Sequence, residues 1–231
     1  MRHAEPPATT DVERDPDALA AAVDAMALAL LPAATLAVPD ELPRLVNDHA
    51  RRAGLSDVSI LLVDLEQTVL TPLPPAPPDL APQDVDTTLA GRCYQADQAL
   101  VSSTTPDGSA VLWVPLIDGS ERLGVLYVRA PLMSDTLVQH CKTFAAAVAE
   151  LVVSKSQYGD ALVLARRQRP MTLAAEMRWS LLPPLTYTTS RAGIACILEP
   201  AYEVAGDAFD YAMDGDVLHL AIFDAMGHGL E

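Results

Sequence analysis

The stretch LWVPLIDGSERLGVLYV (112–128) determines the fold class of this 231-residue chain. Its two apolar runs lie at 110–116 and 122–128, and they are rich in Val, Leu and aromatic residues. Between them stands Asp118-Gly119, a dipeptide that favours tight turns between antiparallel strands. The pattern therefore predicts a pair of antiparallel strands joined by a short turn.

A second strand pair and two helices are expected before this stretch. Residues 58–65 form an apolar run, and 68–73 is the expected hairpin partner. The Asp-Pro pair at 15–16 favours a helix start, and the apolar run that follows is expected to stop at Pro32. A further helix is expected at about 40–53. Together these elements predict an α+β fold, with four to six antiparallel strands flanked by helices.

A long helix is expected after the last strand, from about Ser134 to Pro170. Its seam residues follow one another at alternating steps of four and three, the spacing of a heptad repeat. The first half of such a seam can pack on the sheet of its own domain. Beyond Leu151 the chain is polar outside the seam, which favours a partner helix, so we expect a homodimer through helix 135–168. The seam residues are Leu137, Cys141, Phe144, Val148, Leu151, Lys155, Tyr158, Leu162 and Ala165.

Composition narrows the classes of function. The chain has 31 acidic and 15 basic residues and a formal net charge of −16, which argues against nucleic-acid binding and against docking on anionic membrane. Its three cysteines form no CxxC motif, so a reducing cytoplasm is expected. The Ala-rich run 18–31 is shorter than a membrane span and contains Asp24.

Residues 15–153 resemble a GAF domain. The resemblance lies in TLAGRCYQ (88–95), a short strand at 99–103, the 112–128 strand pair and the closing helix, in that order. It implies a sensor module that binds a small molecule between sheet and helices, or that dimerises; no ligand is identified. Cys93 is a candidate redox or chromophore-attachment residue, or a small buried apolar residue.

The candidate site lies in the last part of the chain. Two apolar runs, at 199–211 and 218–230, flank Asp214-Gly215, so a hairpin is expected there. Pairing its strands would bring Asp207 and Asp224 to one end of a sheet. Two carboxylates beside glycine-containing turns suit Mg²⁺ or Mn²⁺, which prefer oxygen ligands and keep some of their water. Turn-forming aspartates at strand ends are the alternative.

Residues 171–231 resemble the N-terminal portion of a SpoIIE-like phosphatase of the metal-dependent PPM superfamily. The matching pieces are a helix ending in WSLLPP, the segment PAYEVAGDAFDY and the segment AIFDAMGHG. The resemblance implies that Asp207, Asp224 and the backbone carbonyl of Ala225 are ligands of two Mn²⁺ or Mg²⁺ ions in an α/β/β/α sandwich. His228 is a candidate general acid or a structural residue near the ligands. Ala205 stands where the family usually has glycine.

These patterns predict a disordered lead-in (1–14), a GAF-like sensor (15–153), a linker helix (154–170) and a truncated phosphatase domain (171–231). The expected function is a regulatory protein serine/threonine phosphatase acting on a phosphorylated protein, such as an anti-sigma-factor antagonist. Because further family ligands would lie beyond Glu231, this chain alone is expected to be catalytically incomplete. The alternative is a non-catalytic ligand-binding and dimerisation module with a degenerate phosphatase remnant. A transcription regulator is disfavoured, since no basic helix-turn-helix follows the sensor.

Overall fold

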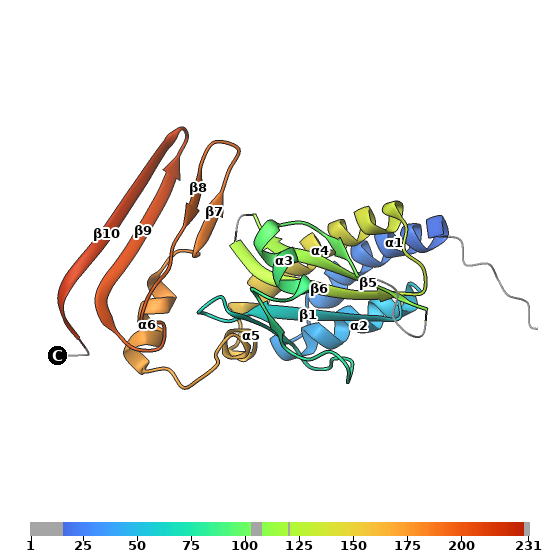
Figure 1. The fold of residues 1–231 in the computed structure, drawn as a ribbon, viewed down its shortest axis with the longest axis horizontal. Coiled ribbons are helices and arrows are strands. Elements are labelled where there is room, and N and C mark those ends of the chain that lie inside the picture. The colour runs from blue at the N-terminus through green and yellow to red at the C-terminus, as the bar shows by residue number, and fades with distance from the viewer. Residues whose placement is uncertain (1–15, 103–107, 120, 229–231) are drawn as a thin grey trace, which may run out of the picture.

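The computed structural model describes residues 16–102, 108–119 and 121–228, and Figure 1 shows their arrangement. The predicted lead-in 1–14 lies outside these residues. The larger part of the described chain forms a domain around a six-stranded antiparallel sheet with the order β3-β2-β1-β6-β5-β4. Both predicted strand pairs are present, which confirms the α+β class. The strands are β1 (Asp57–Val63), β2 (Val69–Pro72), β3 (Gln83–Asp84), β4 (Leu100–Val101), β5 (Ala110–Asp118) and β6 (Glu121–Ala130).

Helices cover both faces of this sheet. One face packs against α1 (Pro16–Ala34), α2 (Leu42–Arg52) and α4 (Asp135–Ser156), and the other packs against α3 (Leu89–Ala96). A single 3-10 turn, η1 (Pro39–Glu41), leads into α2. Among the described helices, α1 has the length and apolar composition of a membrane span, in the window Asp17–Ala34. In this structure its buried side packs in the core against α4 and the sheet.

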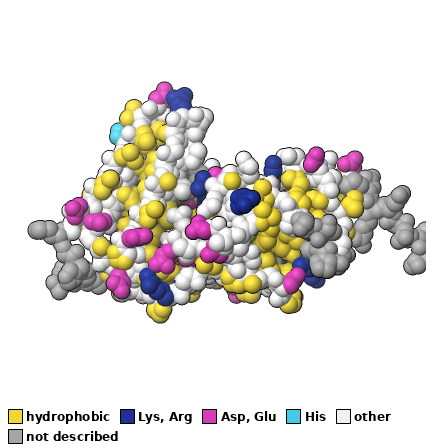
Figure 2. Space-filling view, in the orientation of Figure 1, with side chains coloured by type: hydrophobic (Ala, Val, Ile, Leu, Met, Phe, Trp, Pro, Cys, Tyr) yellow, Lys and Arg dark blue, Asp and Glu magenta, His cyan; other side chains and the backbone are white. Residues whose placement is uncertain are grey.

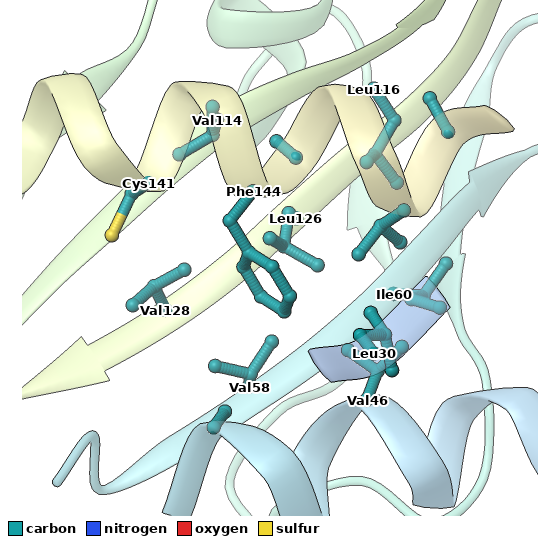
Figure 3. Close-up of a cluster of buried hydrophobic side chains, with 14 of the residues drawn as sticks. Leu30, Val46, Val58, Ile60, Val114, Leu116, Leu126, Val128, Cys141 and Phe144 are labelled. Carbon is teal, nitrogen blue, oxygen red and sulfur yellow. The ribbon is translucent and has the colours of Figure 1, made fainter. Parts of the chain in front are cut away.

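The alternation of side chains along the strands explains why both faces are covered. Val58 and Ile60 of β1 lie in the cluster beneath α1, α2 and α4, while Leu61 lies in the cluster beneath α3. Phe144 of α4 is fully buried at the centre of the first cluster, with Leu126 and Val58 close by in Figure 3. Burial of both faces is therefore what requires such continuous apolar runs in β1, β5 and β6.

Helix α1 extends beyond its predicted end. The helix passes Pro32 and ends at Ala34. A proline lacks the N–H that would bond to the carbonyl four residues earlier, here that of Leu28. Pro32 and Leu28 are both exposed, so water can reach that carbonyl and one more turn is tolerated.

The predicted unbroken helix 135–168 is wrong. Helix α4 ends at Ser156, and a separate short helix, α5 (Ala161–Ala165), follows after Gly159. The seam from Leu137 to Lys155 is buried inside the chain's own core, as was expected for its first half only. Whether two chains associate through this segment stays a prediction.

Lys155, the charged residue of the seam, is buried because its ammonium group is hydrogen-bonded. Its Nζ donates to the carbonyl oxygens of Thr35 (3.2 Å) and Ala37 (2.8 Å), both just after the end of α1. A cation at a helix C-terminus is stabilised by the exposed carbonyls there. Lys155 therefore ties α4 to the end of α1 within the chain.

The remaining elements extend to one side of the six-stranded domain in Figure 1, and the Arg122 backbone N–H of β6 donates a hydrogen bond to Thr186 among them. Helix α6 leads into the Pro-Pro pair of the segment WSLLPP, as the resemblance implied, and the short strand β8 follows it. Two separate two-stranded sheets follow, β7-β8 and β9-β10. These elements are α6 (Leu173–Leu181), β7 (Thr186–Thr188), β8 (Gly193–Ala195), β9 (Ala205–Asp214) and β10 (Val217–His228).

Candidate functional site

The β9–β10 hairpin carries the two predicted aspartates. Its turn is tight, since Asp214 pairs with Val217 and Gly215 has a positive φ of 59°. From that turn the register runs without interruption until Asp207 pairs with Asp224. Residues directly opposite in an antiparallel ladder have Cα atoms about 4.5–5.5 Å apart, with side chains on one face. The structure thus brings the two predicted ligands together, and both are exposed.

An irregularity in the ladder follows at once. Beyond the Asp207–Asp224 pair the register shifts, so that His228 pairs with Ala205. A Cβ added to Gly206 would lie 1.7 Å from the carbonyl oxygen of Ala225. The bulge therefore depends on glycine at 206, and it turns the predicted carbonyl ligand of Ala225 towards β9. At 205, where alanine replaces the family's usual glycine, a side chain is accommodated.

The side chain of His228 lies outside those that the structure describes. Its backbone is in the ladder opposite Ala205. Its predicted function as a general acid stays a prediction.

The donor set fits a hard divalent cation in part. Mg²⁺ is often held by one or two carboxylates and retains several waters, which matches an exposed aspartate pair. Among residues 16–102, 108–119 and 121–228, no group of three or more Asp, Glu, His or Cys side chains could enclose a metal ion. Within the described residues, Asp207 and Asp224 alone would therefore supply only part of a coordination shell.

An apolar surface extends from the aspartates along the hairpin. Phe209 and Tyr211 of β9, with Leu220 and Ile222 of β10, share the face of the Asp207–Asp224 pair because side chains alternate along each strand. With the stretch 194–198 they line a groove of about 580 Å³ that has both aspartates among its lining residues. Ile222 is 88% exposed and Leu220 66% exposed. Figure 2 shows hydrophobic side chains along the length of this hairpin.

Helix α6 holds the segment that leads into β9. The guanidinium of Arg178 donates to the carbonyl oxygens of Pro200 (2.6 Å), Glu203 (2.8 Å) and Ala205 (3.4 Å). The indole Nε1 of the adjacent Trp179 donates to the carbonyl of Ala201 at 2.7 Å. These bonds satisfy backbone carbonyls between Pro200 and Ala205, the first residue of β9. Sequence reasoning missed the bonds of both side chains, although Trp179 opens the segment WSLLPP, because neither spacing nor motif marks such long-range bonds.

The charge of Arg178 also acts on the site. Desolvation by burial lowers the pKa of Arg178, and the nearby Asp207 carboxylate opposes that shift. The two groups are therefore close enough to interact electrostatically. Arg178 is thus a positively charged side chain of α6 that interacts with the candidate site.

A joint at 166–169 connects the six-stranded domain to these elements. Arg166 donates to the carbonyl of Val63 at 3.1 Å, and Arg169 bonds to Glu66 at 2.9 Å in the turn after β1. On the other side, the Arg169 guanidinium lies 4.6 Å from the ring centroid of Tyr202. Tyr202 is 2% exposed, and its hydroxyl accepts a hydrogen bond from the Gln168 backbone N–H at 2.9 Å.

The interior beneath α3 is filled by side chains. Cys93 is fully buried there, and desolvation raises its pKa to about 12. Trp113 and Tyr127 meet edge to face in the same cluster, with ring centroids 5.2 Å apart. A thiol in this environment stays protonated at neutral pH, which favours the apolar reading of Cys93 over the reactive one.

Three solved structures resemble the chain with a TM-score of 0.50. The GAF domain of a phosphoenolpyruvate-protein phosphotransferase from Coxiella burnetii is 13% identical, and the match covers 61% of this chain and 98% of that one. A GAF sensor protein from Burkholderia vietnamiensis is 15% identical over 64% and 99%. Free methionine-R-sulfoxide reductase from Neisseria meningitidis, in complex with its substrate, is 15% identical over 68% and 100%.

At these identities the comparisons show the fold, which is that of a GAF-like domain over roughly the first three-fifths of the chain. No protein-family model matches the sequence. No curated protein matches it either.

Proposed function

We propose that the chain joins a GAF-like sensor to the N-terminal portion of a metal-dependent protein serine/threonine phosphatase of the SpoIIE-like type. The observation that carries the proposal is the direct pairing of Asp207 with Asp224, within the two segments that resemble this family. Turn-forming aspartates have no need to share a rung of the ladder. Like charges opposite one another destabilise a strand pair, so such a pair is better explained by a bound cation.

Asp207, Asp224 and the Ala225 carbonyl would hold Mn²⁺ or Mg²⁺, with ligands from further residues completing two ion sites. Such ions lower the pKa of a bound water and neutralise phosphoryl oxygens during phosphate-ester hydrolysis. The chain's own contribution is to fix the two carboxylates on one face and to bring the carbonyl alongside through the glycine at 206. The substrate class would be a phosphorylated protein, such as an anti-sigma-factor antagonist.

Regulation would pass through the joint at 166–169. Arg169 contacts Glu66 of the sensor and the ring of Tyr202, which lies five positions before Asp207 in the sequence. A change in the β1–β2 turn would therefore reach Tyr202, three residues before the hairpin begins, through the contacts of Arg169. The small molecule that would drive such a change is not identified.

The cellular setting is part of the proposal. All three cysteines are free thiols, in keeping with a reducing cytoplasm.

We also propose that two chains associate as a homodimer through the exposed part of segment 135–168. The exposed apolar side chains there are Tyr158, Val163 and Leu164. Sedimentation velocity of the wild type and of Leu164→Glu tests it: we expect a dimer that the substitution dissociates, and a monomeric wild type would refute it.

A phosphatase assay tests the function. We would continue the chain past Glu231 along its gene and measure Mn²⁺-dependent release of phosphate from a phosphoserine protein. Asp207→Ala and Asp224→Ala should each lower the rate by at least about 100-fold, as expected when a ligand of a catalytic metal is lost. Asp210→Ala is the matched control, since Asp210 is exposed on the same strand but faces the other side. Full activity in both site variants would refute the proposal.

The alternative is a ligand-binding and dimerisation module with a degenerate phosphatase remnant. It is favoured by the GAF-like fold of the larger part and by the lack of a third metal-binding side chain near the aspartates in the described residues. The two readings differ in one observation. If the gene encodes no further aspartates after Glu231 that resemble the family's later ligands, the alternative holds.

A further inference from the structure

A pocket of about 470 Å³ lies between the end of α1, the turn η1 and the last turns of α4. Volumes of roughly 300–1,000 Å³ are usual for small-molecule sites. The pocket is among the helices that cover one face of the six-stranded sheet, whereas the interior beneath α3, on the other face, is filled by side chains. It is therefore separate both from that interior and from the β9–β10 hairpin.

Lys155 is the charged residue that lines this pocket. Its side chain is only 8% exposed, and the carbonyls of Thr35 and Ala37 accept two of the three N–H groups of its ammonium. Within the part of the chain that the structure describes, none of the ion pairs includes Lys155. The neutral carbonyls and the nearby helix ends supply only partial negative charge. A buried cation with one N–H to spare favours an anion beside it.

The rest of the lining determines which kind of anion fits. Leu31 of α1, Val38 before η1 and Leu151 of α4 form apolar walls, and the lining contains no acidic side chain that would repel an anion. A small ion such as phosphate would leave these walls in contact with water. An uncharged apolar molecule would leave the ammonium without a counter-ion. A carboxylate that carries an apolar chain satisfies both parts of the pocket.

We propose that this pocket binds the carboxylate of a medium-chain fatty acid, with the carboxylate on Lys155 and the acyl chain against Leu31, Val38 and Leu151. Leu31 and Val38 are exposed, so a chain longer than the pocket can continue over them. The site goes beyond the proposed phosphatase function and does not rest on it.

The first experiment titrates the full chain with straight-chain carboxylates from butanoate to dodecanoate by isothermal titration calorimetry. We expect the affinity to rise about three- to fourfold with each added methylene until the chain fills the pocket. Acetate has no apolar chain, and octylammonium has the opposite charge. Both should bind at least about 10-fold more weakly than octanoate.

Variants of the lining test the location. Lys155→Met keeps the length of the side chain and should weaken octanoate binding at least about 10-fold, because a charged hydrogen bond is lost. Lys142→Met is the matched control, since Lys142 is an exposed lysine of the same helix, and it should leave the affinity unchanged. Val38→Glu and Val38→Gln form a second pair at an exposed position, where only the glutamate adds a negative charge and should weaken binding. If Lys155→Met fails to fold, the Val38 pair decides.

Three outcomes would overturn the inference. The first is octanoate affinity that is unchanged in folded Lys155→Met or in Val38→Glu. The second is octylammonium binding as tightly as octanoate. The third is the absence of binding by the whole carboxylate series in both wild type and Leu164→Glu, the variant that keeps a second chain from covering the pocket. None of these measurements involves phosphatase activity, so failure of the proposed function would leave their result unaffected.

Discussion

Asp207 lies directly opposite Asp224 in the β9–β10 ladder, and both carboxylates leave the same exposed face of the hairpin. Without a cation this pair should repel, whereas a divalent ion should turn the repulsion into attraction. Whether a mutation at either position stabilises or destabilises the hairpin is therefore expected to depend on the presence of a divalent metal ion.

Asp224→Asn tests this dependence. In metal-free buffer it should stabilise the hairpin by about 0.2–1 kcal/mol, since it removes a like-charge cross-strand pair. With Mn²⁺ present it should destabilise the hairpin, because a ligand is lost. Native-state hydrogen exchange of the β9 and β10 amides measures both. Asp210→Asn, whose cross-strand neighbour is Ala221, should show no such reversal. The same sign with and without Mn²⁺ would contradict the prediction.

Gly206→Ala should disrupt the bulge. The added Cβ would lie 1.7 Å from the Ala225 carbonyl oxygen, and backbone atoms cannot yield as a side-chain tip can. We expect a loss of about 1–3 kcal/mol in local stability, the usual cost of overpacking. Hydrogen exchange at the open end of the hairpin measures it. Ala205→Gly is the control and should cost less, so equal losses for the two variants would show that the bulge places no special demand on 206.

The register of the site could be predicted from sequence, whereas the residues that hold it could not. Asp214-Gly215 fixes the turn, and counting back from a tight turn places Asp207 opposite Asp224. The same local logic predicted the β5–β6 pair. Arg178 reaches carbonyls 22 to 27 positions away, and Lys155 bonds to carbonyls 118 and 120 positions away. Such side-chain-to-backbone bonds leave no periodicity in the sequence, so the heptad pattern gives no sign that Lys155 bonds to the chain just after α1.

Tyr202→Phe should loosen the joint between the two parts of the chain. It removes the hydroxyl that accepts the Gln168 N–H, and the loss of this part-buried hydrogen bond should cost about 0.5–1.5 kcal/mol. Limited proteolysis should then cut faster within 166–172. Tyr158→Phe is the control, because Tyr158 is 75% exposed and its change should alter nothing. Cleavage at wild-type rates in Tyr202→Phe would show that the joint does not depend on this bond.

Phe144→Ala should destabilise the sensor-like domain strongly. Phe144 is fully buried between α4 and the sheet in Figure 3, and removing such a ring costs about 3–5 kcal/mol through lost burial and the cavity left behind. Urea unfolding measures the change, with exposed Thr143→Ala on the same helix as control. A loss below about 1 kcal/mol would mean that the core can collapse around the missing ring.

Alkaline pH should destabilise the fold through its buried thiols. Burial raises the pKa of Cys93 and of Cys141 to about 12, from an ordinary 9.0. Unfolding lets each thiol ionise at its ordinary pKa, so their stabilising contribution is complete below pH 9 and is lost as the pH rises towards 12. At about 1.4 kcal/mol per pKa unit, each thiol should lower the free energy of unfolding by roughly 2 kcal/mol between pH 9 and 10.5.

Substitution of one thiol isolates this contribution from the other groups that titrate at high pH. Cys141→Ala leaves a small cavity and so lowers stability at every pH, but it removes one ionisable group from the unfolded chain. Its free energy of unfolding should therefore fall less steeply than that of wild type between pH 9 and 10.5, by the roughly 2 kcal/mol assigned to one thiol. Urea titrations at four pH values in this range measure both slopes. Parallel curves for the two proteins would mean that the Cys141 thiol ionises in the folded chain as readily as in water.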